Sequence, residues 1–248
     1  MKVFVIIPAA GLGTRMSAAA KASRRPALSK QFAELGGAPI LIRTLRKFAA
    51  CPPVSEIYIA LRKKEGEQFR PRLEKEAFKK PVHLVEGGEN RQQSVANALD
   101  RIRAGKDDVV LVHDAVRPFI DSELIVSVIE AAQKFGAAIA GVPAVDTIKQ
   151  VERTAGGALI TATIPRERVV MAQTPQGFRY EILRQAFDQA SADGYTGTDE
   201  ASLVERSGQD VAVVMGSHRN LKITTPADLE LAEFYLEQEN RDSDTLTG

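Results

Sequence analysis

Apolar and polar positions along this chain follow the alternation typical of an α/β fold. Short apolar runs of strand length occur at 2–7, 55–61, 82–85, 108–113, 137–145 and 211–215. Stretches with helical periodicity occur at 66–80, 90–102, 121–135, 180–192, 199–207 and from residue 225 onward. Strands that alternate with helices form parallel sheets covered by helices on both faces. The pattern predicts a three-layer α/β/α sandwich with a mostly parallel, Rossmann-like sheet, in a single domain spanning residues 1–248.

The alternation changes between Asp146 and Phe178. Residues 147–151 and 159–163 alternate apolar and polar positions, and Thr154-Ala155-Gly156-Gly157 offers a turn between them. This is the signature of a β-hairpin. A lone two-stranded hairpin is only marginally stable in water. We therefore expect an arm at about 146–168 that packs on a second copy of the chain, as in a homodimer.

The composition restricts the classes of partner. Among the 248 residues the formal net charge is +1, which argues against broad nonspecific binding of nucleic acid. Cys51 is the single cysteine, so neither an intrachain disulfide nor a zinc site built mainly on thiolates is possible. No apolar run is long enough to span a bilayer, and the N-terminus lacks a signal-peptide pattern. We expect a cytoplasmic protein that binds neither nucleic acid nor membrane.

A loop of small residues follows the first apolar run directly. Its sequence is Pro8-Ala9-Ala10-Gly11-Leu12-Gly13-Thr14-Arg15-Met16. Small residues let backbone amides approach a ligand, successive amides bind anions, and Arg15 adds a permanent cation. Open α/β sheets bind ligands at the carboxyl ends of their strands, which favours a triphosphate cradle here. The alternative is a plain strand-to-helix turn, because Met16 replaces the third glycine of a Rossmann fingerprint.

A second polar segment, His113-Asp114-Ala115-Val116-Arg117-Pro118, ends the most apolar run. The carboxylate of Asp114 can hold a hard cation such as Mg²⁺. Arg117 can pair with Asp114 or bind a second anion, and a surface salt bridge is the alternative. We expect His113 to be structural, because it has no partner ligands nearby in the sequence.

A third segment, Gly87-Gly88-Glu89-Asn90-Arg91-Gln92-Gln93-Ser94, opens a predicted helix. Its amides and polar side chains suit a base or a ribose, whereas ordinary capping by Asn90 explains the same residues equally well. Other polar residues, taken singly, favour ordinary structural roles. Lys30 is the better candidate for a fixed cation, because it begins a new segment after a basic link.

Taken together, these segments resemble one family over nearly the whole chain. The matching motifs, in order, are Pro8-Ala9-Ala10-Gly11-x-Gly13-x-Arg15-Met16, Lys30-Gln31, Gly87-Gly88-x-x-Arg91-x-x-Ser94-Val95, His113-Asp114-Ala115-x-Arg117-Pro118, Asp146-Thr147, Gln173-Thr174-Pro175-Gln176, Thr198-Asp199-Glu200-Ala201-Ser202 and Leu221-Lys222-Ile223-Thr224. The series resembles the 2-C-methyl-D-erythritol 4-phosphate cytidylyltransferase family. Single motifs are shared with sugar nucleotidyltransferases, but the full series is more specific.

The resemblance implies that CTP and methylerythritol phosphate react to give a CDP-alcohol and pyrophosphate. The attacking phosphate oxygen is already anionic at neutral pH, so catalysis consists of positioning and charge stabilisation. By the same resemblance, Arg15 and Lys30 are the catalytic residues that stabilise charge at the α-phosphorus. Asp114 is expected to hold Mg²⁺.

The resemblance also assigns contacts to both substrates. The residues expected to contact CTP are Ala9, Ala10, Gly11, Gly88, Glu89, Ser94 and Ala115. The residues expected to hold the polyol phosphate are Asp114, Arg117, Thr147, Arg166, Thr174, Thr198 and Lys222. In this family the arm crosses to a partner subunit, which implies that Arg166 acts in trans within a homodimer.

Two departures from the family pattern affect the site. The link Ser17–Ser29 is longer and more basic than usual, with Ser29 in place of a proline, which leaves the position of Lys30 open. Val116 replaces a usual alanine beside Asp114. The alternatives are a ribitol-5-phosphate cytidylyltransferase, which shares most of these motifs, and a non-catalytic nucleotide-binding regulatory subunit. The presence of the charged set disfavours the second.

Overall fold

The computed structural model describes residues 1–11 and 29–245 and has a seven-stranded sheet at its centre. The strands lie in the order β11-β7-β10-β6-β1-β4-β5. Their bounds are β1 (Val3–Pro8), β4 (Glu56–Leu61), β5 (Val82–Glu86), β6 (Val109–Val112), β7 (Ala137–Pro143), β10 (Val170–Arg179) and β11 (Ala212–Met215). Neighbouring strands are parallel except at β10, which is antiparallel to both β6 and β7. The predicted mostly parallel sheet is confirmed.

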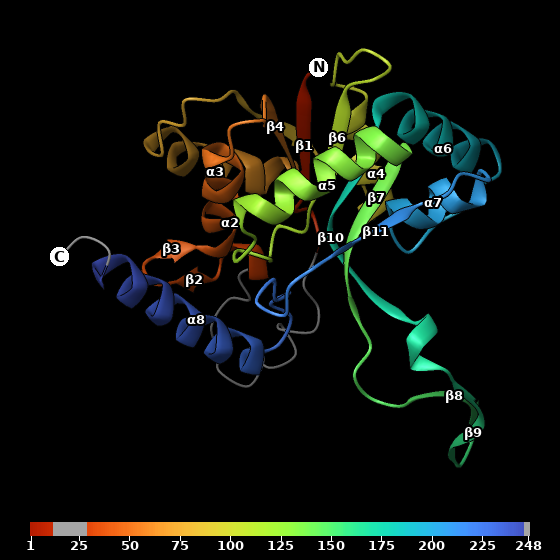
Figure 1. Cartoon of the computed structure of the whole chain (residues 1–248). Helices are drawn as coiled ribbons and strands as arrows, with labels where there is room; N and C mark the ends of the chain where they lie inside the picture. The colour runs from red at the N-terminus through yellow and green to blue at the C-terminus, as the bar shows by residue number, and fades with distance from the viewer. Residues whose placement is uncertain (12–28, 246–248) are drawn as a thin grey trace.

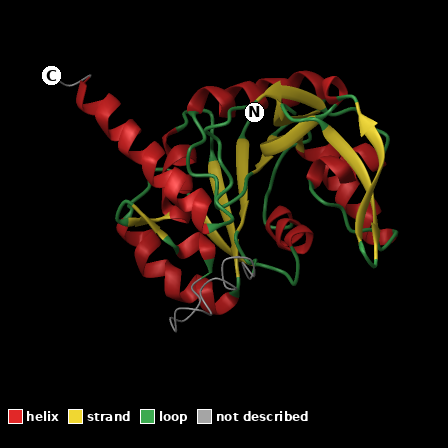
Figure 2. Cartoon of the chain, turned by 90° about the horizontal axis from the view of Figure 1, so that it is seen from below, coloured by secondary structure: helices red, strands yellow, loops and turns green. Residues whose placement is uncertain are grey.

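Helices cover both faces of this sheet (Figure 2). Their bounds are α2 (Ile40–Ala50), α3 (Lys63–Lys75), α4 (Arg91–Leu99), α5 (Ser122–Phe135), α6 (Tyr180–Ala192), α7 (Glu200–Arg206) and α8 (Pro226–Thr245). Because side chains alternate along a strand, β1 serves two cores. Val3, Val5 and Ile7 join the core under α2 and α5, whereas Phe4 and Ile6 join the core under α4 and α6. The predicted α/β/α sandwich is therefore present.

A third, smaller core lies under α8. There Leu236 of α8 joins Ile223, Val116 and Leu35, the last from a small ribbon of β2 (Glu34–Leu35) and β3 (Ala38–Pro39). The amide of Ile223 donates to the carbonyl of Val116 at 2.9 Å. This core holds the segment after β6 against the segment before α8, and so brings Lys222 toward Asp114.

Two helix starts, those of α4 and α5, show the capping chemistry expected from the sequence. The side chain of Asn90 accepts the amide of Gln93 at 2.8 Å, and that of Asp121 accepts the amide of Leu124 at 2.7 Å. Each bond satisfies one of the free amides at a helix start. The predicted helix at 66–80 was wrong in its bounds, since α3 begins and ends about one turn earlier.

Of the larger elements, α2 and β10 were not predicted from the sequence. In β10 the peptide bond between Thr174 and Pro175 is cis, and the pairing with β7 shifts register between Ala172 and Gln176. A proline argues against a central strand, because it cannot donate to the ladder. The register shift accommodates Pro175 and displaces Thr174 from regular pairing, toward the end of the sheet where β6 stops.

The hairpin reaches away from the sheet (Figure 1). It consists of β8 (Ile148–Thr154) and β9 (Gly157–Ile164), which pair only with each other and are followed by η3 (Arg166–Arg168). No part of residues 1–11 and 29–245 covers the apolar side chains of the arm, and Leu159 and Ile160 are each 64% exposed. The predicted hairpin arm is confirmed, and its role in dimerisation stays a prediction.

Two further features concern the chain as a whole. Cys51, the single cysteine, follows α2 and is fully buried. Among the helices of residues 1–11 and 29–245, none is long and apolar enough to cross a membrane.

Candidate functional site

A cavity of about 220 Å³ opens where β1, β4, β5 and β6 end. The polypeptide segments that line it are far apart in the sequence. The lining residues are Pro8, Ala9, Ala10, Gly11, Lys30, Gln31, Arg62, Glu89, Asn90, Arg91, Ser94, Asp114, Ala115, Val116 and Lys222. The cavity therefore unites the first loop, the helix-start segment and the segment after β6, as expected for the carboxyl end of a parallel sheet.

Lys30 lies beside the first loop because its neighbours anchor it. It begins a short 3₁₀ helix, η2 (Lys30–Phe32), in which the buried side chain of Gln31 donates to the carbonyl of Ala9 at 2.7 Å. On the other side, the hydroxyl of Ser29 donates to Glu65 at 2.6 Å. The structure thus places Lys30 at the cavity despite the long link before it.

The second predicted catalytic residue, Arg15, lies outside the described residues, as does most of the basic link that follows it. Its assignment stays a prediction. The described part of the loop, Ala9 to Gly11, lines the cavity.

The helix-start segment is held by its own hydrogen bonds. The amide of Gly88 donates to Ser94 Oγ at 3.0 Å, and that hydroxyl donates to the carbonyl of Asn90 at 2.8 Å. The amide of Glu89 donates to Gln93 Oε1 at 2.9 Å. Capping by Asn90 is therefore real, and it also fixes Glu89 and Ser94 in the cavity wall. Capping by Asn90 and binding of a base or ribose are therefore compatible roles for this segment.

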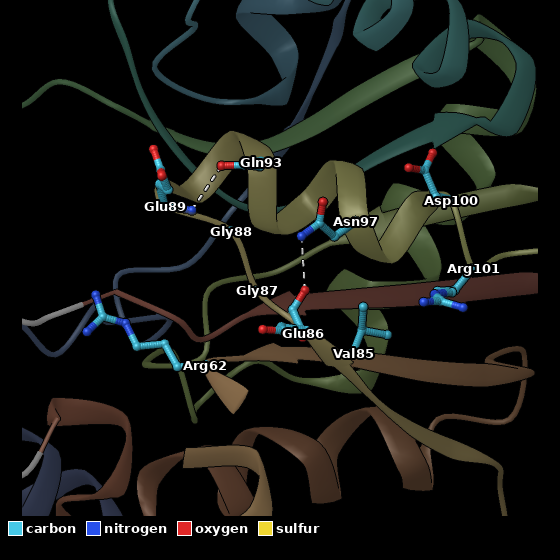
Figure 3. Close-up of a pocket in the computed structure, with 10 residues that line it drawn as sticks. All are labelled: Arg62, Val85, Glu86, Gly87, Gly88, Glu89, Gln93, Asn97, Asp100 and Arg101. Atoms are coloured by element: carbon cyan, nitrogen blue, oxygen red, sulfur yellow. Dashed lines mark hydrogen bonds between the residues drawn. The ribbon is translucent and has the colours of Figure 1, made fainter. Parts of the chain in front are cut away.

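A larger hollow, of about 750 Å³, lies along β5 and α4 next to this cavity (Figure 3). Gly88 lines it, and Asn97 closes part of it by donating to the carbonyl of Glu86 at 3.0 Å. It shares Arg62 and Glu89 with the smaller cavity but includes none of Lys30, Asp114 and Lys222. The smaller cavity contains the charged residues expected to act on the substrates, so we take it as the site despite its smaller volume.

Three cations surround Asp114. Its Oδ2 lies 2.9 Å from Lys222 Nζ and 3.1 Å from Arg117 Nε, and its Oδ1 lies 3.7 Å from Arg91 Nε. Burial alone would raise the pKa of Asp114, but the charges of Lys222, Arg91 and Arg117 hold that pKa well below its ordinary value. The carboxylate stays ionised, and the predicted pairing of Arg117 with Asp114 is present.

His113 is connected to Asp114 through hydrogen bonds with Arg117 and Thr174. Its Nε2 lies 3.1 Å from the carbonyl of Arg117, and since a carbonyl only accepts, Nε2 carries the proton. Its Nδ1 then accepts from the Thr174 hydroxyl at 3.1 Å, and the same hydroxyl oxygen accepts the amide of Asp114 at 3.0 Å. Burial lowers the pKa of His113 to about 4, which keeps the ring neutral. These bonds agree with the structural role expected for His113.

The residues predicted to hold the second substrate differ in their access to the cavity. Lys222 lines it, and 42% of its side chain is exposed. Arg117 and Thr174 are buried, and the Nη1 of Arg117 donates to the carbonyl of Asn220 at 2.7 Å. Thr198 is exposed just before Asp199, which caps α7.

The structure separates the two arm residues from the cavity. Thr147 and Arg166 are exposed at the base of the arm, and neither lines the cavity of its own chain. The Nη1 of Arg166 donates to the carbonyl of Val145 at 2.8 Å. Their predicted contact with the second substrate stays a prediction.

One pair of residues in the site was not assigned from the sequence. The Nη1 of Arg91 donates to Glu200 Oε1 at 2.7 Å, although the two residues are 109 positions apart. Glu200 is 1% exposed, and burial raises its pKa. Both residues lie in motifs that the chain shares with the family. The sequence signal for Glu200 was an acidic residue directly after the cap of a helix.

The described residues include no group of three or more potential metal ligands from histidine, cysteine, aspartate and glutamate. Mg²⁺ needs fewer, since it commonly binds one or two carboxylates together with phosphate oxygens of a substrate. Asp114 Oδ1 accepts no hydrogen bond within the described chain and faces the cavity-lining Arg91 only at 3.7 Å. This donor fits a Mg²⁺ ion that arrives with a nucleotide.

Comparisons with known proteins identify the family of this chain. The family model of IspD, 2-C-methyl-D-erythritol 4-phosphate cytidylyltransferase, matches residues 3–238. Relatives of that name from Acidobacterium capsulatum and Solibacter usitatus are 60% and 52% identical, each over 96% of this chain and 98% and 97% of their own lengths. The crystal structure of the Thermus thermophilus enzyme is 34% identical, with a TM-score of 0.72 over 95% of this chain and 98% of that one. The structure from Francisella tularensis is also 34% identical, with a TM-score of 0.77 over 94% of this chain and 99% of that one. The chain belongs to the 2-C-methyl-D-erythritol 4-phosphate cytidylyltransferase family.

Proposed function

We propose that this protein transfers the cytidylyl group of CTP to 2-C-methyl-D-erythritol 4-phosphate, a step in nonmevalonate isoprenoid precursor synthesis. The observation that carries the proposal is the charge arrangement of the cavity. Lys30 and Lys222 bring positive charge to a wall of small residues, and Lys222 is paired with Asp114 in the same wall. A cationic cavity suits two anionic substrates that must approach each other.

In the proposed reaction, a phosphate oxygen of the polyol phosphate attacks the α-phosphorus of CTP. A new phosphorus–oxygen bond forms, the bond to the β-phosphate oxygen breaks, and pyrophosphate leaves with the electron pair. Lys30 and Arg15 would stabilise negative charge at the α-phosphorus, and Lys222 would orient the attacking phosphate. Mg²⁺ held by Asp114 would screen the charge of the triphosphate.

The competing activities separate in one assay. Pyrophosphate release is measured with CTP and either 2-C-methyl-D-erythritol 4-phosphate or ribitol 5-phosphate, with a blank lacking any acceptor. The proposal expects release with the first acceptor and little with the second. Turnover of ribitol 5-phosphate alone would establish the alternative cytidylyltransferase. CTP binding without release from either acceptor would establish a regulatory subunit.

We further propose that two chains form a homodimer in which the arm of each helps to build the site of the other. The support is the exposed apolar surface of the arm, including Leu159 and Ile160, and the absence of Arg166 from the described lining of its own cavity. Unpartnered apolar surface of this kind is typical of an interaction site.

Mixing two defective variants tests the exchange. Arg166→Ala and Lys30→Ala homodimers are each expected to have low activity. If Arg166 acts in trans, random mixing gives about a quarter of the wild-type sites, because half of the dimers are mixed and each has one intact site. No recovery on mixing would show that Arg166 acts within its own chain. Deletion of residues 147–163 is expected to give monomers with poor activity, measured by sedimentation and turnover.

The proposed substrates also suggest where the protein works. CTP is a cytoplasmic nucleotide, so we place the reaction in the cytoplasm. Cell fractionation with an antibody to the protein tests this placement.

A further inference from the structure

The two oxygens of Asp114 have different surroundings. Oδ2 is bonded to both Arg117 and Lys222, at 3.1 and 2.9 Å. Oδ1 has only Arg91 nearby, with its Nε at 3.7 Å. This distance permits charge attraction but exceeds that of a hydrogen bond. One oxygen of a nearly buried carboxylate is thus left without a hydrogen bond from the described chain.

Arg91 is kept at this distance by a second carboxylate. Its Nη1 donates to Glu200 Oε1 at 2.7 Å, which is the length of a strong, charge-assisted bond. Arg91 is the first residue of α4 and Glu200 the first of α7. The caps of these helices, Asn90 and Asp199, fix both backbone positions, so the guanidinium is anchored on Glu200.

Glu200 occupies an unfavourable place for a carboxylate. It is 1% exposed, and its Oε2 has no hydrogen-bond partner in the described chain. A buried polar atom without a partner costs free energy, and such atoms are uncommon in folded proteins. Within residues 1–11 and 29–245, Arg91 is the only side chain that forms a hydrogen bond with Glu200.

Loss of the Glu200 charge would leave Arg91 with Asp114 as its nearest anion. A movement of about 1 Å would close the gap between Nε and Oδ1 to hydrogen-bond length. Arg91 is partly buried, and a partly desolvated cation gains by pairing with an ionised carboxylate, so this closure is favourable. The remaining oxygen of Asp114 would then be occupied by the protein itself.

We propose that Glu200 is a positioning residue that holds Arg91 back and so keeps Asp114 Oδ1 open for an electropositive ligand. That ligand is either the divalent cation that accompanies CTP or a hydroxyl of the polyol phosphate. The inference rests on the proposed function, because that function brings both groups to Asp114.

The test compares Glu200→Gln with the double variant Glu200→Gln/Arg91→Gln. Mn²⁺ binding in the presence of CTP, followed by electron paramagnetic resonance, reports on the cation. The KM for the polyol phosphate at saturating CTP and metal reports on the hydroxyl. We expect Glu200→Gln to weaken one of the two by about 10- to 100-fold, as for other residues that orient a ligand-binding group. The double variant is expected to recover most of that loss, because it removes the competing guanidinium.

A matched control is Glu205→Gln, an exposed glutamate on the same helix, which is expected to match the wild type in both measurements. If Mn²⁺ binding weakens, the ligand of Oδ1 is the cation. If the KM for the polyol phosphate rises, the ligand is a hydroxyl of that substrate. The proposal is overturned if Glu200→Gln changes neither measurement, or if the double variant is no better than the single one. A purely structural role predicts the latter result.

Thermal unfolding is followed for every variant. If Glu200→Gln alone does not fold, the double variant decides: binding within about tenfold of wild type supports the proposal, and a larger loss refutes it. Failure of the proposed function is a separate result, because it appears as absence of pyrophosphate release by the wild type.

Discussion

The cavity around Asp114 buries charge, whereas the β8–β9 arm exposes apolar side chains. Asp114 is 7% exposed and is surrounded by cations, while Ile160 on the arm is 64% exposed and belongs to none of the three cores formed by the described residues. Both regions depart from the usual distribution of polar and apolar residues, in opposite directions. Buried charge indicates a place prepared for a charged ligand, and an exposed apolar strand pair indicates a place prepared for another protein surface.

The largest effect is expected for Asp114→Asn. The change removes the negative charge that the buried Arg117 needs, so the free energy of unfolding should fall by about 3 kcal/mol. Turnover should fall at least about 100-fold, because the cations of the cavity lose their common partner. Urea unfolding and pyrophosphate release measure the two effects. Glu152→Gln, at an exposed position of the arm, is the control for stability and should leave the free energy of unfolding unchanged. An equal free energy of unfolding for the two variants would show that charge buried at Asp114 is no more important for stability than charge exposed on the arm.

A smaller effect is expected for Thr174→Val, which keeps the shape of the side chain. It leaves His113 Nδ1 and the amide of Asp114 without partners inside the protein, at a cost of about 1–3 kcal/mol in unfolding free energy. The matched change on the arm is Thr161→Val, whose hydroxyl bond is exposed to solvent. Chemical denaturation of both variants compares them, and a similar loss at the two positions would show that burial does not decide the cost.

The pH dependence of stability should be carried in part by His113. Burial lowers the pKa of His113 from 6.5 to about 4 in the folded protein. Between these values the unfolded chain binds more protons than the folded one, so stability falls as the pH falls below 6.5. The expected loss from this group between pH 7 and pH 5 is about 2 kcal/mol. Urea unfolding at several pH values measures it. The loss should persist in His83→Gln, since His83 is exposed, and its absence in the wild type would contradict a neutral buried ring.

The smallest effect on the subunit itself is expected for Ile160→Ser. The side chain is already exposed, so the free energy of unfolding of the isolated chain should change by less than about 0.5 kcal/mol. If the arm docks on a partner, the same change should weaken dimerisation, which sedimentation at a series of protein concentrations measures. A large loss of stability in the isolated chain would mean that the arm packs on its own subunit.

The elements predicted correctly from the sequence are those that a local pattern of residues determines. The run at β1 is apolar on both sides because it lies between two cores, and the arm alternates around a glycine turn. The helix start at Asn90 followed from capping chemistry, and the Asp114–Arg117 pair from close spacing.

The features missed from the sequence depend on contacts between segments that are far apart along the chain. Pro175 and Gly177 argue against a strand at β10, which forms because β6 and β7 flank it on both sides. The contact of Arg91 with Glu200 joins two helix starts across 109 positions, and no spacing rule connects them. The position of Lys30 likewise depends on the distant bond from Gln31 to the first loop.

The buried thiol at Cys51 makes this protein convenient for spectroscopy. Because the sequence has no other cysteine and this one is fully buried, a dye or nitroxide reagent meets little background reaction. A single cysteine placed at Gly156, in the turn of the arm, could therefore carry a selective label. Distances between two such labels would report directly how arms from separate chains are arranged in solution.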